Sequence, residues 1–191
     1  MKNAETSVFK VGLIGALSNL GAALRHALLS RQHEVVALVG DLNALQARPG
    51  QHCKLCDPFD ALSISEAAAG LDAVICVYPG DVSEPANASL SDAIVALSVG
   101  LPRAGVRRLL LVADFDRDDS DELARNQLLA CTDVVWTLVQ SPTGTDTPGR
   151  LEDFINQPLS DHHQRLLGVA GGILDEARLD NHVRELIRFR G

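Results

Sequence analysis

The sequence predicts an α/β protein built on a doubly wound parallel sheet, with helices on both faces and the strand order 3-2-1-4-5-6. Short apolar segments typical of buried strands alternate along the chain with segments whose apolar residues recur at helical spacing. No linker rich in Pro, Gly or Ser divides the 191 residues, and 46% of them are hydrophobic, enough for one core. We therefore expect a single domain over residues 1–191, with ligand outside the carboxyl ends of the first and fourth strands.

The first strand and the first helix meet at a glycine. Apolar residues at 11, 13 and 14 predict the strand, Gly15 breaks it, and helical spacing begins near Leu20 and Gly21. A parallel strand that turns through glycine into a helix directs free N–H groups, and the positive end of the helix dipole, toward one place. We expect the amides after Gly15 to surround an open pocket that accepts a diphosphate.

The remaining segments continue the alternation. The turn-rich residues 141–172 predict a small flap on the substrate side, and helical spacing at 179–187 predicts a last helix with His182 on its packed face. Further strands are predicted at 34–39, 52–55, 72–78, 108–112 and 134–139, and further helices at 62–69, 87–101 and 120–129.

Composition disfavours several kinds of partner. The formal net charge is −8 and the pI is near 5.1, whereas nucleic-acid binding needs a basic surface that neutralises phosphate. No apolar run reaches the roughly 18 residues of a membrane span, and the N-terminus lacks the plan of a signal peptide, so we expect a cytoplasmic protein. The small residues in 87–101 suit packing between subunits or within one chain, which leaves a monomer and a homodimer open.

Several motif pieces, in this order and spacing, carry a resemblance to a known family. They are 15–21 (GALSNLG), 33–35 with 37–39, Asp57, 70–75 (GLDAVI) and 135–137 (VWT). Over nearly its whole length the chain resembles the atypical, NAD(P)H-binding branch of the short-chain dehydrogenase/reductase superfamily. This branch contains flavin and biliverdin reductases and NmrA-like redox sensors. The resemblance implies a Rossmann fold, with NAD or NADP as the cofactor.

The same resemblance indicates the cofactor site. The family's pattern of three glycines, each separated by two residues, falls on Gly15, Ser18 and Gly21, so the middle glycine is missing. The side chain of Ser18 either crowds the diphosphate or adds a hydrogen bond to it. The residues expected to bind the cofactor are Gly15, Leu17, Ser18, Asn19, Leu20, Gly21, Gly40, Asp41, Asp57, Tyr78 and Pro79.

The choice between NAD and NADP stays open. NADP-using relatives carry an arginine directly after the second strand, where this chain has Gly40, and the next basic residue is Arg48. Asp41 could bind a ribose diol, but many relatives have an aspartate there after the arginine, so it does not indicate NAD. Asp57 matches the acid that commonly meets the adenine edge.

The acid/base pair of the superfamily is absent. That pair is a tyrosine whose pKa is lowered by a lysine four residues later. The chain has one tyrosine, Tyr78, and its lysines, Lys2, Lys10 and Lys54, all precede it. Reductases of the atypical branch can act without the pair, because hydride transfer to a planar acceptor chiefly requires close stacking. We rank such a reductase first, ahead of a non-catalytic redox sensor and a degenerate scaffold.

Several side chains are open to two interpretations. Tyr78 is either a stacking surface for a planar group or an aromatic plug at a strand end. His162 and His163 could supply a proton from the flap or be solvated there. Cys53 and Cys56 have CxxC spacing but no second ligand pair, so buried sheet residues are favoured over redox chemistry, and no metal site is expected.

Groups after the last predicted strands could also line the site. They are Ala113 and Asp114 after the fifth strand, and Ser141, Pro142 and Thr143 after the sixth. The acidic run 114–122 is expected to cap the following helix through Asp118, Asp119 or Ser120. An EF-hand is rejected, because Asp119 replaces the turn glycine of a calcium loop and Arg125 replaces its closing glutamate.

Overall fold

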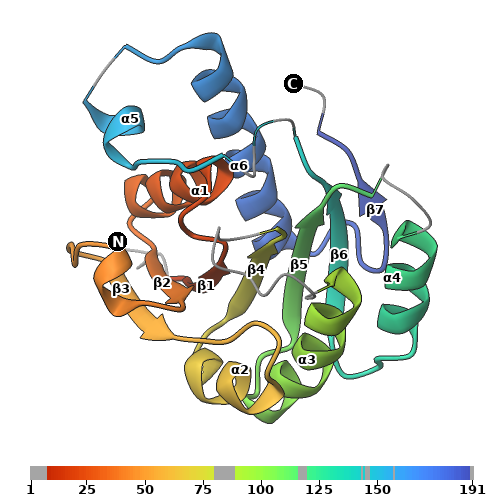
Figure 1. Cartoon of the computed structure of the whole chain (residues 1–191). Coiled ribbons are helices and arrows are strands. Elements are labelled where there is room, and N and C mark those ends of the chain that lie inside the picture. Colours follow the sequence, from red (N-terminus) through yellow and green to blue (C-terminus); the bar gives the residue numbers. More distant parts are fainter. Residues whose placement is uncertain are drawn as a thin grey trace, which may run out of the picture.

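The centre of the molecule is a parallel sheet of seven strands in the order β3-β2-β1-β4-β5-β6-β7 (Figure 1). The computed structural model describes residues 8–79, 89–115, 120–142, 144, 147–156 and 158–189. The predicted doubly wound sheet is confirmed, and a seventh strand extends it. The strands are β1 (Lys10–Ile14), β2 (Glu34–Val39), β3 (Gln51–Leu55), β4 (Ala73–Val77), β5 (Arg108–Ala113), β6 (Val135–Gln140) and β7 (Leu186–Ile187).

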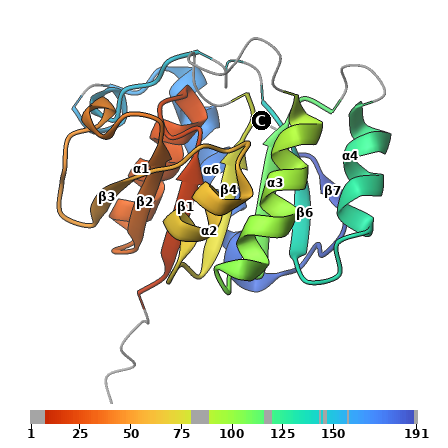
Figure 2. The same ribbon diagram turned by 60° about the horizontal axis from the view of Figure 1, so that its bottom comes forward.

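Helices cover both faces of this sheet (Figure 2). The helices α1 (Asn19–Ser30) and α6 (Asp161–Leu179) pack together on one face. The other face is covered by α2 (Ala61–Ala68), α3 (Leu90–Arg103) and α4 (Ser120–Leu129), and two short helices, η1 (Leu42–Ala44) and α5 (Glu152–Ile155), lie in connections. None of the helices that the structure describes is long and apolar enough to cross a membrane.

Alternate residues of each strand supply the two cores. Leu110 and Val112 of β5 join the core under α1 and α6, whereas Leu109 and Leu111 join the core under α2, α3 and α4. Because both faces are buried, the strands are continuous apolar runs in the sequence. The small residues of α3 serve packing within the chain at Gly100, where a Cβ would lie 2.7 Å from the carbonyl oxygen of Ala61 on α2.

The structure differs from the prediction in the C-terminal part of the chain. Residues 161–172, expected in the flap, form the first part of α6. The helix expected at 179–187 is wrong, because α6 ends at Leu179 and its C-cap Asp180 is left-handed, with φ of 51°. Leu179 is 64% exposed and Val183 39%, so their helical spacing did not mark a buried face.

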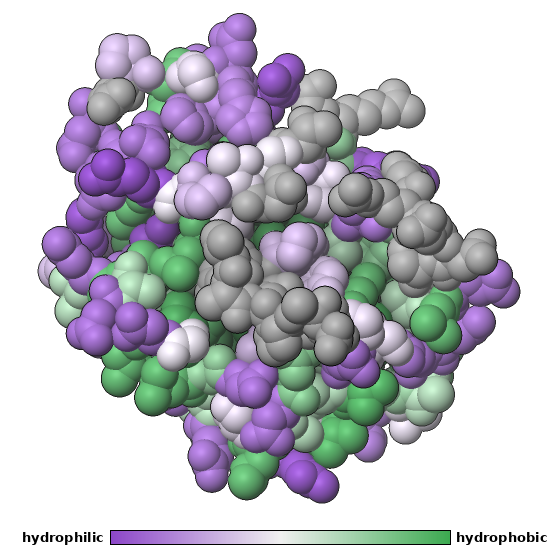
Figure 3. Space-filling view, in the orientation of Figure 1, coloured by the Kyte–Doolittle hydropathy of each residue, from purple (hydrophilic) through white to green (hydrophobic). Residues whose placement is uncertain are grey.

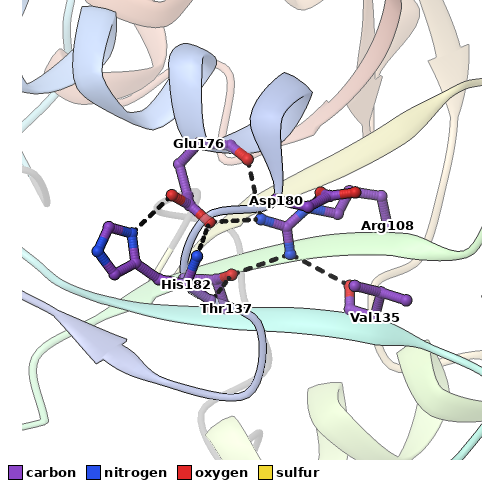
Figure 4. Close-up of polar contacts among 6 residues, drawn as sticks. All are labelled: Arg108, Val135, Thr137, Glu176, Asp180 and His182. Carbon is purple, nitrogen blue, oxygen red and sulfur yellow. Dashed lines mark hydrogen bonds and ion pairs between the residues drawn. The ribbon is translucent and has the colours of Figure 1, made fainter.

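A buried charged network holds the segment after α6 (Figure 4). Arg108, at the start of β5, forms ion pairs with Glu176 at 3.0 Å and with Asp180 at 2.6 Å. Glu176 also accepts the backbone N–H of His182 at 2.8 Å and lies 2.8 Å from Nδ1 of the His182 ring. The predicted packing of His182 in an apolar stripe is therefore wrong, and its half-exposed ring belongs to this polar network.

Candidate functional site

The backbone geometry requires glycine at two positions in the turn between β1 and α1. Gly15 has a φ of 74°, a left-handed conformation that a side chain would strain. A Cβ on Gly21 would lie 2.2 Å from the carbonyl oxygen of Gly15, so only glycine allows α1 to begin this close to the strand end. These are the roles expected of the first and third glycines of a dinucleotide-binding turn.

Ser18 uses its hydroxyl to cap α1. The Oγ atom accepts the N–H of Gly21 at 3.0 Å and donates to the carbonyl oxygen of Gly15 at 2.8 Å. The residue is only 2% exposed. Sequence analysis offered two roles for this side chain, crowding a ligand or bonding to it, and the structure shows a third, in which the hydroxyl satisfies the turn itself.

Residues 147–149, which we call the strap, cross the amino end of α1. The N–H of Asn19 donates to the carbonyl oxygen of Thr147 at 2.8 Å, and the N–H of Gly149 donates to that of Leu17 at 2.9 Å. The backbones touch, since a Cβ on Gly149 would lie 2.4 Å from Cα of Asn19. The expectation of an open anion pocket is corrected here, because the amide of Asn19 already has an acceptor from the chain.

The strap connects the end of β6 to α5, and Figure 1 shows this cyan segment passing over α1. It meets the turn as an antiparallel bridge between Pro148 and Ser18. The next helical amide, that of Leu20, has no hydrogen-bond acceptor among the residues that the structure describes. Of the two amides nearest the helix start, that of Asn19 therefore has an acceptor, whereas that of Leu20 has none among the described residues and belongs to a fully buried residue.

Three residues expected near the adenosine follow β2 and β3. Gly40 is exposed, and a Cβ there would meet nothing within 4 Å. The Asp41 carboxylate caps η1 by accepting the N–H of Asn43 at 2.9 Å, and that of Asp57 accepts the N–H of Phe59 at 2.9 Å. Both carboxylates already order their own loops, and Gly40 leaves open space beside them.

Tyr78 and Pro79 follow β4, next to the turn, because β4 pairs with β1. Tyr78 is half-buried, packs against the core under α2 and α3, and donates its N–H to Val112 at 2.8 Å. Pro79 is exposed after a cis peptide bond. The ring of Tyr78 is thus anchored on the core side at the carboxyl edge of the sheet.

The ends of β5 and β6 are joined by a side chain that sequence analysis missed. Nε2 of Gln140 donates to the carboxylate of Asp114 at 2.9 Å, and its Oε1 accepts the N–H of Phe115 at 3.2 Å. Ser141 donates its N–H to Ala113 at 2.8 Å. Gln140 carried no signal, because it continues an apolar strand by only one residue.

Thr143 and the capping residues Asp118 and Asp119 lie outside the described residues, and so does the side chain of Ser120.

Three histidines lie near α5 and Gly144, and two of them contact the ring of Phe154. His163, in the first turn of α6, has its ring centroid 4.9 Å from that of Phe154, and His26 of α1 lies 6.3 Å from the same ring. A Cβ on Gly144 would come within 3.0 Å of His162. Burial lowers the pKa of His26. His26 and Phe154 were missed, since neither stands in a motif. Figure 3 shows hydrophilic residues gathered over α5 and the start of α6.

Of the CxxC pair, Cys53 is half-buried on β3 and Cys56 is buried one residue past the end of that strand. Burial raises the pKa of Cys56 to about 12 and also raises the pKa of Cys53. A thiol held protonated is a poor nucleophile and a poor metal ligand. No group of three His, Cys, Asp or Glu side chains among the described residues could hold a metal ion.

The sheet order and the glycine turn define the class of protein: a doubly wound α/β domain of the type that holds dinucleotides at its first helix. A protein-family profile described as NAD(P)H-binding matches residues 15–161. The chain belongs to this NAD(P)H-binding family, and its cofactor is NAD or NADP. No sequence among the curated proteins matches the chain.

Solved structures share the whole fold. A Rossmann-fold NAD(P)-binding family protein from Shigella flexneri has a TM-score of 0.69 at 15% identity, covering 95% of this chain and 92% of its own. A candidate epimerase from Bacteroides thetaiotaomicron has a TM-score of 0.68 at 20% identity, covering 95% of this chain and 96% of its own. An oxidoreductase from Lactococcus lactis has a TM-score of 0.66 at 16% identity, covering 94% of this chain and 90% of its own. At these identities the likeness shows the fold alone.

The residues of the turn fit a dinucleotide, and the strap opposes one. Gly15 and Gly21 keep the backbone path, and the N–H of Leu20 has no acceptor among the described residues. The carbonyl oxygen of Thr147, however, is bonded to the N–H of Asn19, where a diphosphate oxygen would need the same donor. A bound diphosphate at Asn19 therefore requires the strap to move.

Proposed function

We propose that this protein is an NAD(P)H-dependent oxidoreductase of the atypical short-chain dehydrogenase/reductase type, which reduces a small planar acceptor without a Tyr–Lys pair. The observation that supports this best is the turn itself, with Gly15 at a φ of 74° and Gly21 packed against it at the carboxyl end of β1. The family match agrees with a retained site.

The proposed cofactor site extends across the carboxyl ends of β1, β2, β3 and β4. In the proposal, Leu17, Ser18 and Asn19 surround the diphosphate with the two turn glycines and Leu20. Gly40, Asp41 and Asp57 lie at the adenosine, and Tyr78 and Pro79 lie at the nicotinamide. When bound, NAD(P)H supplies a hydride, and the chain holds donor and acceptor in contact.

We propose a planar acceptor because Tyr78 offers an aromatic face on which such a group can stack. The half-buried ring of Tyr78 stands where β4 ends, and an aromatic face at that place can stack on a flat group. The residue four positions later is Val82, so the lysine of the Tyr–Lys pair is absent from its usual position. An acceptor whose reduction needs only a hydride and a proton from water suits such a site.

A second function, a dinucleotide-responsive sensor, is favoured by the strap. Binding that displaces residues 147–149 from α1 would change the surface over that helix, which is what a reporting protein requires. The missing Tyr–Lys pair is compatible with either function. In both, we expect the cytoplasm as the compartment, because no disulfide joins the four cysteines, all of which the structure describes.

Calorimetric titration with NADH and NADPH tests the proposal. We expect binding that is lost in Gly15→Val, where a side chain would force the left-handed turn, and kept in Gly168→Val, where a Cβ meets open space. Oxidation of the reduced cofactor by an added flavin then favours the reductase, and binding without turnover favours the sensor. Absence of binding at millimolar concentration would leave a scaffold and overturn both.

A further inference from the structure

We propose that the strap is a displaceable internal competitor of the dinucleotide. The carbonyl oxygen of Thr147 holds the N–H of Asn19, and a diphosphate oxygen takes that N–H when the strap moves away. This inference rests on the proposed dinucleotide binding and concerns its regulation: the apparent affinity is set by the fraction of molecules in which the strap is displaced.

The turn does not need the strap for its own stability. Ser18 caps α1 through its own hydroxyl, and its carbonyl oxygen accepts the N–H of Ala22 at 2.8 Å. The first apolar residues of the helix, Leu20 and Leu24, are fully buried against the sheet. Removing the strap therefore leaves the start of α1 capped and packed, ready to receive another acceptor.

The strap itself is held lightly. Thr147 and Pro148 are exposed, and Gly149 is half-buried. Among the described residues, the strap's hydrogen bonds with the turn are the two backbone bonds to Asn19 and Leu17, and just before the strap Nδ2 of Asn19 donates to the carbonyl oxygen of Gly144 at 3.3 Å. Each such bond favours the closed form by about fivefold, so the two together hold it by about 30-fold over the displaced form.

The chain beyond the strap is fixed, so displacement does not require local unfolding of α5. Leu151 is 2% exposed and Phe154 is 4% exposed, both in the interior beside α1. Glu152 forms an ion pair with Arg48 of the connection before β3. Movement is thereby confined to the residues before Leu151, and α5 keeps its place when the strap leaves.

A single methyl group should displace the strap. A Cβ on Gly149 would lie 2.4 Å from Cα of Asn19 and 2.7 Å from the carbonyl oxygen of Ser18, both backbone atoms that cannot turn aside. We expect Gly149→Ala to bind NADH about 30-fold more tightly than the wild-type protein in calorimetric titration. Gly168→Ala is the matched control, because a Cβ there meets open space on α6, and we expect its affinity to be unchanged.

Amide hydrogen exchange supplies a readout that does not depend on turnover. In the wild-type protein we expect saturating NADH to remove protection from the Gly149 N–H while that of Asn19 stays protected by its new acceptor. Gly149→Ala should lose protection at position 149 without any ligand.

The outcomes separate this inference from the proposed function. Equal NADH affinity in wild type and Gly149→Ala, or a Gly149 amide that stays protected under NADH, overturns the competitor and leaves dinucleotide binding intact. If neither protein binds although exchange shows the strap released, both ideas fall. A strap that stays protected in Gly149→Ala and in the bulkier Gly149→Val is not displaceable, which also overturns the inference.

Discussion

Ser18 stands at the position where related turns place a glycine beside the ligand, and here its side chain serves the helix. The hydroxyl is both donor and acceptor within the turn, and it closes the amide of Gly21 that would otherwise face the crevice. A residue that looks like a defect in a motif is thus a functional helix cap. The side chain at this position therefore stabilises the turn and the start of α1.

Replacement of Ser18 measures how much this cap contributes to the free energy of unfolding. We expect Ser18→Ala to lower the free energy of unfolding by about 1 kcal/mol, because the cap is lost, and Ser18→Gly to lower it by only a few tenths of that. Urea unfolding followed by the fluorescence of Trp136, the single tryptophan, gives both values. Equal losses in the two variants would contradict a capping role for the hydroxyl.

An arginine at position 40 should shift the preference between NADH and NADPH. An arginine side chain fits there, since a Cβ meets nothing within 4 Å, and its guanidinium can bind a 2′-phosphate through two bonds. We expect Gly40→Arg to improve the affinity for NADPH relative to NADH by about tenfold or more, about 1.4 kcal/mol. Competitive titration of the two cofactors measures the ratio.

The control for Gly40→Arg is Gly168→Arg, which adds the same charge at an exposed, open position on α6. An equal shift in both variants would mean that net charge, and not a contact after β2, changes the preference. A Gly40→Arg protein that prefers NADH as before would place the adenosine ribose away from this residue.

At the level of elements, β1 to β6 were predictable as short apolar runs and α2, α3 and α4 from helical spacing, whereas β7 was not predicted. The helix α6 was missed although its buried residues Leu166, Val169, Ile173 and Leu174 have helical spacing. The flap predicted over residues 141–172 covered the first part of this helix. Within it, Gly172 is required by packing, since a Cβ there would lie 2.3 Å from the ring of Phe189.

The strap could not be predicted from sequence at all. Its contacts join Asn19 to Thr147 and Leu17 to Gly149 through backbone atoms only, so no side-chain pattern marks them. The glycine turn was predictable for the opposite reason, because Gly15 and Gly21 are demanded by their own local conformation and packing. Local constraints leave a trace in the sequence, and long-range backbone pairing does not.

One buried ion pair joins the last turn of α6 to the start of β5. Glu176→Gln would leave Arg108 buried with only Asp180 as an ionic partner, so we expect a loss of about 3 to 5 kcal/mol in the free energy of unfolding. The control is Asp175→Asn on the same helix, whose ion pair with Arg31 is largely exposed and contributes about 0 to 1 kcal/mol. Urea unfolding compares them, and equal losses would contradict the special position of Glu176.

Over the whole molecule, α6 links the two ends of the sheet. Its 19 residues span roughly 28 Å. The first turn places His162 and His163 near the strap, at the carboxyl edge of the strands, and the last turn places Glu176 against Arg108 at the amino edge. One helix therefore supports both the cofactor side and the attachment of the C-terminal segment.

Two histidines, the half-buried His26 and the buried His33, make the stability of the whole protein depend on pH. Burial lowers the pKa of His26 and of His33 from the model-compound value of 6.5, and Arg178 and Arg31 lower that of His33 further. His33 is 4% exposed, and its Nδ1 accepts the N–H of Phe9 at 3.4 Å, which a doubly protonated ring cannot do. Both rings are neutral in the folded protein near neutral pH.

The sign of the effect follows from proton linkage. As the pH falls below 6.5 the unfolded chain binds more protons at these two histidines than the folded protein does, so the free energy of unfolding falls as the pH drops from 6.5 toward the folded pKa values. Above 6.5 neither state binds them, and this dependence disappears. We expect the wild-type protein to be measurably less stable at about pH 5.5 than at about pH 7.5.

Substitution of His26 isolates its share, because glutamine cannot take up the proton. The difference in unfolding free energy between the two pH values should shrink in His26→Gln and persist in His52→Gln, where the histidine is exposed on β3. Trp136 fluorescence reports both unfolding curves, since the indole is fully buried in the folded protein. If His26→Gln keeps the whole pH dependence, the half-buried ring beside Phe154 does not contribute to it, and His33 with the remaining titrating groups must account for the slope.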